Sequence, residues 1–437
     1  MLSINSLLLL LVFLSIPTGG RATDSFDVFG RLECEGEPLV NAWVVFYATD
    51  RWLAEDALCA VNRTDERGDF AVRARQTRLF GLQSAGNLVF FARHSCNQTR
   101  PRCSQFAVRS EVWARRRRVA ERHNLGRKDQ FITFVGCANG HGGRLPGCGR
   151  AAAVLRDSEF LKRSRQASHS SSYSFCLCRI PYEWANVVSE PETDRRRLEA
   201  LPEVIAVNKT LAHATKLAVQ HQRELVVIGG DHSCAIGTFS GVAAGVQPRG
   251  RVGLIWIDAH LDAHTPLTSH SGNLHGMPIA HLLGHGDSAL CGLFDFLPKL
   301  RPEHLVLIGA RSFEQEEREF LESMNVRIFY MEEVRERGCY AVLKEAIEHT
   351  TDGTCGFTLS VDLDAFDPQD APAIGCPETG GILADEFLRA VGRVDLRKLL
   401  ATEVVEFLPV RDSPDRRTEK LVVKLIHQLY ANKWGLR

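Results

Sequence analysis

The feature that most constrains this chain is a rhythm of short apolar runs that begins at residue 131. Segments with helical periodicity separate several of these runs. Buried strands that alternate with helices are typical of an α/β domain whose parallel sheet is covered on both faces. We therefore predict a doubly wound, mainly parallel α/β domain over residues 131–437. The predicted strands are 131–135, 225–228, 252–257, 305–308, 326–329, 356–361 and 400–405, and the predicted helices include 195–222, 276–284, 332–349 and 415–432.

Polar residues follow three of these predicted strands where each strand ends. Residues i, i+2 and i+4 of an extended segment point to one side, so each set converges. Parallel strands also place their carboxyl ends at one edge of the sheet, where the reactive crevice of such folds lies. We expect one cluster of two histidines and four carboxylates: His232, Asp258, His260, Asp262, Asp362 and Asp364.

Four carboxylates packed together need positive charge, because each would otherwise raise the pKa of the others. Two divalent cations supply four positive charges. Imidazole and carboxylate ligands without a thiolate suit Mn²⁺ and disfavour zinc–thiolate and iron–sulfur sites. The pattern therefore predicts two Mn²⁺ ions per chain.

Three motifs carry a resemblance to a known family: GGDHSCAIGT, WIDAHLDAHTPLTSHSGNLHGMP and SVDLDAFDPQDAPAIGCPETGG. They resemble the ureohydrolases, and within that family most closely the arginases, over about 300 residues from Gly136 onward. The resemblance implies a binuclear manganese site with His232, His260 and Asp362 as terminal ligands. Asp258, Asp262 and Asp364 would complete the two coordination shells with bridging contacts. It also implies a homotrimer.

The resemblance further implies a mechanism of guanidine hydrolysis. Two metals lower the pKa of a shared water, so that hydroxide attacks the guanidinium carbon near neutral pH. Asp262 would also orient the hydroxide, and His275 would shuttle a proton to the leaving amine. Glu406 would pair with the planar substrate guanidinium. The products would be urea and an amine.

The residues that would read the rest of the substrate only partly follow the arginase pattern. Ser269 and Ser271 match it, whereas His264 replaces an asparagine, Glu314 an aspartate and Cys376 a threonine. A neutral His264 is expected to donate to a carboxylate, and Glu314 to pair with an ammonium group. L-arginine is therefore the leading substrate. Agmatine, another guanidino acid or formiminoglutamate stay open as alternatives, as does a catalytically silent secreted binding protein.

The N-terminal part reads as a separate secreted module. Residues 1–22 contain an apolar run at 7–16 that is typical of a secretory signal and too short to span a membrane. Residues 24–112 predict a small β-sandwich with strands at 26–32, 40–47, 68–74 and 87–93. The segments FDVFGRLECEGEPLVNAWVVFYATD, TDERGDF and FFARHSC resemble the transthyretin-like family of nematodes. That resemblance implies a sandwich without catalytic machinery and leaves its ligand open.

Several further expectations concern the compartment and the loops. Lys plus Arg equals Asp plus Glu at 53 each, so neither nucleic acid nor a membrane surface is an expected partner. Residues 113–130 form a basic linker whose arginine run, 115–118, is either solvated or cleaved, and 165–174 form an exposed serine-rich loop. Gly140–Gly143 is expected to be an active-site loop. Secretion would permit disulfides among Cys34, Cys59, Cys96 and Cys103, and glycans at Asn62, Asn97 and Asn208.

Overall fold

A computed structural model of the chain divides into two compact units, residues 1–126 and 127–437. In the first unit the structure describes the backbone of eight strands. In the second it describes residues 131–145, 147–166, 180–189 and 194–436. The predicted linker, Cys96, Cys103 and the sequon at Asn97 lie outside the described residues. The first two residues of the serine-rich loop predicted at 165–174 belong to a helix, Glu159–Gln166, and the rest of that loop lies outside the described residues.

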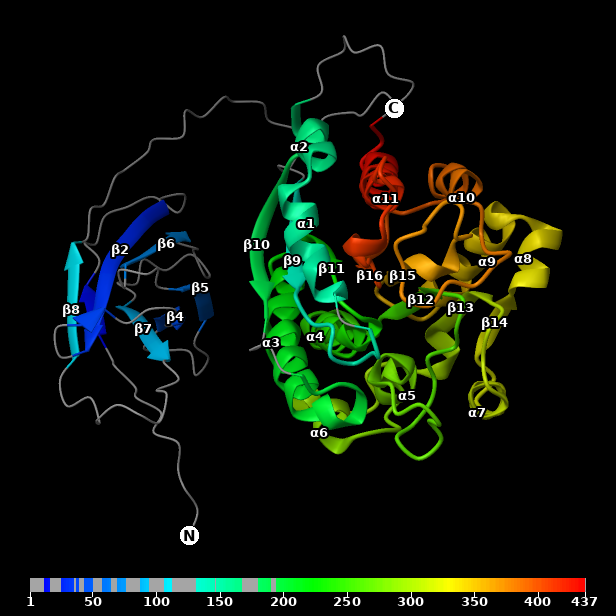
Figure 1. Ribbon diagram of the computed structural model, residues 1–437, viewed down its shortest axis with the longest axis horizontal. Coiled ribbons are helices and arrows are strands. Elements are labelled where there is room, and N and C mark those ends of the chain that lie inside the picture. Colours follow the sequence, from blue (N-terminus) through cyan, green and yellow to red (C-terminus); the bar gives the residue numbers. More distant parts are fainter. Residues whose placement is uncertain are drawn as a thin grey trace. The chain divides into compact units, whose positions relative to one another are not determined.

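The N-terminal unit consists of two antiparallel sheets (Figure 1). One has the strand order β1-β7-β4-β5, and in the other β2 pairs with β3, β6 and β8. The predicted all-β class of this unit is confirmed. β1 lies inside the segment 1–22, whose role as a signal sequence stays a prediction. The strands are β1 (Val12–Ser15), β2 (Ser25–Cys34), β3 (Glu37–Pro38), β4 (Trp43–Thr49), β5 (Ala57–Arg63), β6 (Asp69–Arg75), β7 (Asn87–Arg93) and β8 (Phe106–Glu111).

The C-terminal unit is built on an eight-stranded sheet of order β10-β9-β11-β16-β15-β12-β13-β14, in which every pairing is parallel. This confirms the predicted α/β class. The final strand, β16, lies between β11 and β15 in the middle of the sheet. The strands are β9 (Ile132–Cys137), β10 (Tyr182–Val188), β11 (Glu224–Ile228), β12 (Gly253–Ile257), β13 (Leu305–Ala310), β14 (Arg327–Tyr330), β15 (Phe357–Asp362) and β16 (Leu399–Val405).

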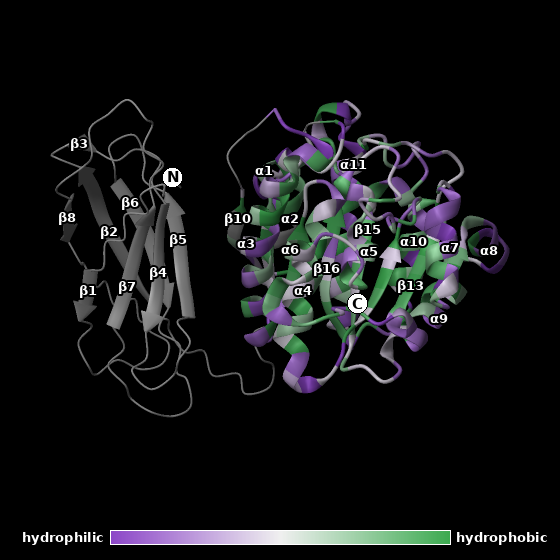
Figure 2. Cartoon of the chain, turned by 90° about the horizontal axis from the view of Figure 1, so that it is seen from below, coloured by the Kyte–Doolittle hydropathy of each residue, from purple (hydrophilic) through white to green (hydrophobic). Residues whose placement is uncertain are grey.

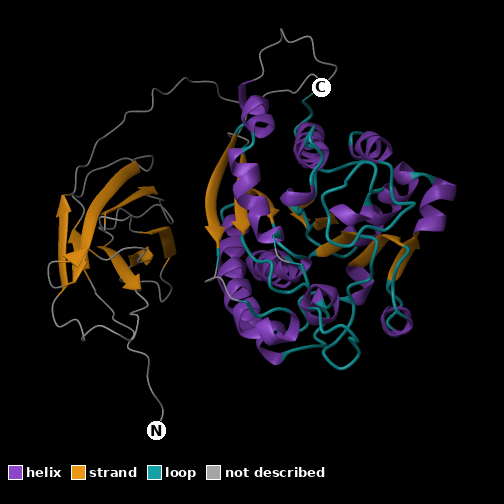
Figure 3. Ribbon diagram, viewed as in Figure 1, coloured by secondary structure: helices purple, strands orange, loops and turns teal. Residues whose placement is uncertain are grey.

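Helices cover both faces of this sheet (Figure 3), because successive strand residues point to opposite sides. Val226 and Ile228 of β11 face one core, together with residues of α1, α2 and α8 to α11. Leu225 and Val227 face the other core, together with residues of α3, α4, α5 and α7. The helices are α1 (Ala151–Asp157), α2 (Glu159–Gln166), α3 (Leu201–Gln220), α4 (Ala235–Val246), α5 (Pro278–Leu282), α6 (Ser288–Cys291), α7 (Gln315–Ser323), α8 (Met331–Arg337), α9 (Cys339–Thr351), α10 (Ala384–Val391) and α11 (Arg417–Lys433).

Hydropathy follows this layering (Figure 2): the strands are hydrophobic and the outer helix surfaces are more hydrophilic. The helix predicted at 332–349 is divided into α8 and α9 at Gly338, whose φ of 77° no helix accommodates. The helix predicted at 195–222 has its α-helical part only from Leu201.

The sequon at Asn208 lies on α3 in the interior. The Asn208 side chain is fully buried, donates to Val204 O and accepts from Gly237 N. The folded unit therefore cannot carry a glycan there, which corrects the expectation from the sequon. Among the described helices, none is long and apolar enough to cross a membrane.

Candidate metal centre

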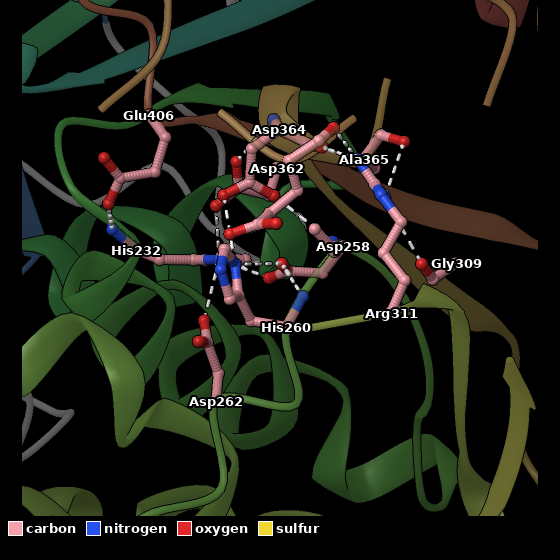
Figure 4. Close-up of polar contacts among 12 residues, drawn as sticks. His232, Asp258, His260, Asp262, Gly309, Arg311, Asp362, Asp364, Ala365 and Glu406 are labelled. Carbon is pink, nitrogen blue, oxygen red and sulfur yellow. Dashed lines mark hydrogen bonds and ion pairs between the residues drawn. The ribbon is translucent and has the colours of Figure 1, made fainter. Parts of the chain in front are cut away.

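The candidate site lies at the carboxyl ends of four neighbouring central strands, β11, β16, β15 and β12. The chain leaves β11 through Gly229 and Gly230, and a Cβ on Gly230 would lie 1.5 Å from Asn139 O. Only glycine permits this close approach, which directs the next residues across the strand ends. All six predicted ligands converge here (Figure 4).

The first group of ligand atoms surrounds His232. Its Nδ1 faces three carboxylate oxygens at 3.0 to 3.1 Å, which belong to Asp258, Asp262 and Asp362. His232, Asp258 and Asp362 are all buried, and their ligand atoms lie close enough together to hold one ion.

The second group surrounds His260. Its Nδ1 lies 3.3 Å from Asp258 Oδ1 and 3.1 Å from Asp364 Oδ2. His260, Asp258 and Asp364 again lie close enough to hold one ion. Asp258 therefore belongs to both groups, with one carboxylate oxygen turned to each histidine. That arrangement is what a carboxylate bridging two cations requires.

The buried charges fit a pair of divalent cations. Nδ1 of His232 is buried and makes no hydrogen bond of acceptable geometry, although it is surrounded by carboxylate oxygens. Burial and the neighbouring charges of Asp364 and Asp258 raise the pKa of Asp362 well above its usual range. Burial and Asp258 likewise raise the pKa of Asp262 to about 6. Cations would remove this repulsion, and the His232 lone pair is placed to ligate one.

Two buried residues that the sequence did not reveal support His232 from behind. Its Nε2 lies 2.9 Å from Ser360 Oγ, and the Ser360 hydroxyl donates to Glu403 Oε2 at 3.0 Å. Since that hydroxyl proton is committed to Glu403, Ser360 Oγ accepts the Nε2 proton. This fixes the tautomer that leaves Nδ1 free to bind a metal. The sequence does carry one signal for Glu403, because it is the one acidic residue within the apolar run 399–405.

The loop that carries Asp364 is also held from behind, by Arg311 at the end of β13. Its guanidinium donates to Asp364 O at 2.7 Å and to Ala365 O at 3.2 Å (Figure 4). Asp364 N in turn donates to Asp362 Oδ1 at 2.8 Å. These bonds fix the spacing of the second pair of carboxylates.

Glu406 follows β16 with a left-handed φ of 61°, and its carboxylate is buried beside the cluster. Oε1 accepts from His232 N at 2.8 Å and lies 3.0 Å from His275 Nδ1. Oε2 accepts from the Cys148 thiol at 3.3 Å, a contact that the sequence did not predict. Burial would lower the pKa of His275, but the hydrogen bond with Glu406 and the surrounding carboxylates raise it to about 9. These contacts favour the protonated form of His275.

The residues predicted to read the rest of the substrate lie on more exposed loops. Ser271 and Cys376 are exposed, and Glu314 caps the start of α7. Ser269 Oγ accepts from Gly272 N at 3.0 Å. Both ring nitrogens of His264, which is expected to donate to a substrate carboxylate, have protein partners. Nδ1 lies 3.1 Å from Thr268 Oγ1 and Nε2 lies 3.2 Å from Glu314 Oε2.

The described cysteines of the C-terminal unit take no part in the ligand cluster. Among the described residues of this unit, all seven cysteines are free thiols.

Comparison with known proteins gives two family matches. Residues 132–431 match the model described as Arginase family, and residues 29–109 match the Transthyretin-like family. An arginase from Bacillus subtilis is 33% identical over 307 residues, which cover 70% of this chain and 99% of that protein. An arginase from Bacillus caldovelox is 41% identical over 238 residues, or 54% of this chain and 78% of that protein.

Solved structures give the same result. The Bacillus caldovelox arginase structure has a TM-score of 0.60 at 34% identity, and it covers 69% of this chain and 98% of its own. A Bacillus subtilis arginase structure, with the same coverage, has a TM-score of 0.59 at 31% identity. A formimidoylglutamase from Bacillus subtilis, at 21% identity, shares the fold with a TM-score of 0.55.

Proposed function

The chain belongs to the arginase family, and on that premise we propose that it hydrolyses L-arginine to L-ornithine and urea with two Mn²⁺ ions. Its C-terminal unit is an arginase-type ureohydrolase. The observation that carries the proposal is the position of Asp258 in two ligand groups, each completed by one histidine and one further carboxylate. That arrangement supports two cations that share a ligand.

The chemistry divides between the metal pair and the residues around it. Two bound Mn²⁺ ions supply a water whose pKa is low enough for hydroxide chemistry at neutral pH. The six residues that would hold the ions are His232, Asp258, His260, Asp262, Asp362 and Asp364. Asp262, which is held at a left-handed φ of 47°, would also orient that water.

Two other residues act on the substrate. Glu406 is buried and accepts a hydrogen bond from His232 N, so its carboxylate is oriented before the substrate arrives. This carboxylate pairs with the nitrogens of the substrate guanidinium. His275, which the same carboxylate keeps protonated, gives its proton to the leaving amine. Glu406 is buried and His275 is partly buried, and the contact between them holds both side chains in place.

The substrate and the compartment are parts of the same proposal. L-arginine is proposed as the substrate because Ser269, Ser271 and Glu314, on loops near the site, match or approach the arginase pattern. His264 and Cys376 depart from the arginase pattern. Agmatine, other guanidino acids and formiminoglutamate are therefore still candidate substrates. Secretion is proposed from the apolar leader at 7–16.

A substrate panel tests the proposal. Urea release would be measured from L-arginine, agmatine and guanidinobutyrate with Mn²⁺, and the metal content determined on the same sample. We expect about two Mn²⁺ per chain and the highest kcat/KM with L-arginine. Preference for another compound overturns the substrate, and the absence of urea from all three together with less than one metal per chain overturns the enzyme.

A further inference from the structure

A short basic segment joins two loops at the rim of the metal centre. Arg197 N donates to His141 O at 2.9 Å, and Leu198 N donates to Gly272 O at 2.9 Å. The first loop contacts the site because Gly142 N donates to Asp231 Oδ2, and the second loop leads into His275. The segment is therefore fixed in position against both loops.

Arg197 is held there in a conformation that is unfavourable for arginine. Its φ is 59°, in the left-handed region. Such a conformation costs about 1 to 3 kcal/mol and persists where the surroundings enforce it, often at functional sites. The backbone bonds to His141 and Gly272 are the constraint that enforces it here.

The guanidinium of Arg197 differs from those of its neighbours in its charge partners. Arg195 forms an ion pair with Glu203 at 2.6 Å, and Arg196 lies 2.8 Å from His141 Nδ1. Arg197 donates only through Nη1, to Ser271 O at 3.3 Å, and within the described part of the chain no carboxylate lies at ion-pair distance from it. It therefore presents a positive charge without an ion-pair partner beside Ser271.

The loop from His264 to Gly272 thus meets opposite charges at its two ends. At one end His264 contacts Glu314, and further along His270 contacts Glu316 at 3.4 Å. At the other end Ser271 contacts Arg197. Both ring nitrogens of His264 are occupied, whereas Arg197 presents a cationic hydrogen-bond donor beside Ser271.

We propose that Arg197 is a specificity-determining residue, which binds the α-carboxylate of the substrate beside Ser271. This inference rests on the proposed function, because it takes the guanidinium end of the substrate to lie at Glu406 and the amino-acid end at the rim. A planar guanidinium matches a carboxylate through paired hydrogen bonds. Glu314 takes the ammonium group, so the rim selects a zwitterionic amino acid over an amine without a carboxylate.

Binding measurements on the manganese-loaded enzyme test this inference separately from turnover. The ligands are L-ornithine and putrescine, which differ in the carboxylate, and the variants are Arg197→Gln and Arg195→Gln. The second variant removes the same charge from the same segment, but its partner is Glu203. Calorimetry gives the Kd values, and metal content and thermal unfolding check that each variant is folded.

We expect Arg197→Gln to weaken L-ornithine binding about tenfold to a hundredfold, as for the loss of a hydrogen bond to a charged group. Putrescine binding should stay unchanged, and Arg195→Gln should bind both ligands as the wild type does. Equal Kd values for L-ornithine in Arg197→Gln and the wild type overturn the inference, as does an equal loss with putrescine. A chain that releases urea from no guanidino compound overturns the proposed function instead, and the L-ornithine comparison still judges Arg197.

Discussion

Replacement of Ser360 by alanine removes the contact that orients His232. Ser360 lies on β15 with its hydroxyl between His232 Nε2, at 2.9 Å, and Glu403 Oε2, at 3.0 Å. All three side chains are buried. The alanine variant leaves the Nε2 proton without its partner and allows the imidazole to rotate or change tautomer, so the nitrogen that faces the carboxylates is no longer held as a metal ligand.

The size of the effect follows from that burial. A buried donor without a partner costs roughly 1 to 3 kcal/mol. Loss of a hydrogen bond behind a histidine ligand weakens metal binding about tenfold to a hundredfold, which is the same range. We therefore expect the Kd for Mn²⁺ to rise by that factor in Ser360→Ala. Competition dialysis against a chelator of known affinity measures it without reference to activity.

Thr358→Val is the matched control on the same strand. The Thr358 hydroxyl donates to Gly253 O at 2.9 Å and is equally buried, but it has no contact with the ligand groups. This variant should lose stability without losing manganese affinity. If Ser360→Ala binds Mn²⁺ as tightly as the wild type, or if both variants lose affinity alike, Ser360 does not act through His232.

Three further predictions concern the remaining parts of the site. Asp258→Asn should reduce manganese below one ion per chain while Asp362→Asn keeps one, because only Asp258 belongs to both groups; equal metal contents by mass spectrometry would contradict the shared ligand. His275→Asn should lower kcat by a factor of about 10² to 10⁴ at full manganese content, since it removes the proton donor and no ligand; unchanged kcat in urea assays would exclude that role. Glu317 lies in the first turn of α7, is buried and accepts from Ala263 N at 3.0 Å. Burial raises its pKa from 4.5 to about 8, so the folded state binds more protons than the unfolded state between those values. Its contribution to stability is complete below pH 4.5 and is lost toward pH 8 at up to about 1.4 kcal/mol per pH unit. In urea unfolding, Glu317→Gln should remove this part of the pH dependence, and an unchanged slope would refute it.

The sequence predicted the sheet well because its strands are apolar runs, and it predicted the ligand positions because acids and histidines follow those runs directly. It missed α4, whose twelve residues are all buried and therefore show no helical periodicity. It also missed the edge strand β10, in which YEWANVV mixes polar and apolar residues around a register shift.

The support around the ligands was harder to predict for a different reason. Ser360 and Glu403 lie on neighbouring strands but are 43 residues apart in the chain, so no short sequence motif contains both. Their roles depend on the parallel pairing of β15 with β16, in which Ser360 lies opposite Glu403. Arg197 was similarly hidden, because its importance comes from two distant loops that meet beside it.

The place of β16 has a consequence for the order in which the molecule can mature. Chains are made from the N-terminus, and β16 is the last strand to be made. It nevertheless pairs on one side with β11, which leads to His232, and on the other with β15, which carries Asp362. A nascent chain that lacks residues 399–405 holds the two halves of the sheet without the strand that joins them, and it lacks Glu403 and Glu406 as well. We therefore expect the ligand cluster to assemble only after residues 399–405 have been made. An interrupted translation product would carry the ligand residues but not the assembled centre.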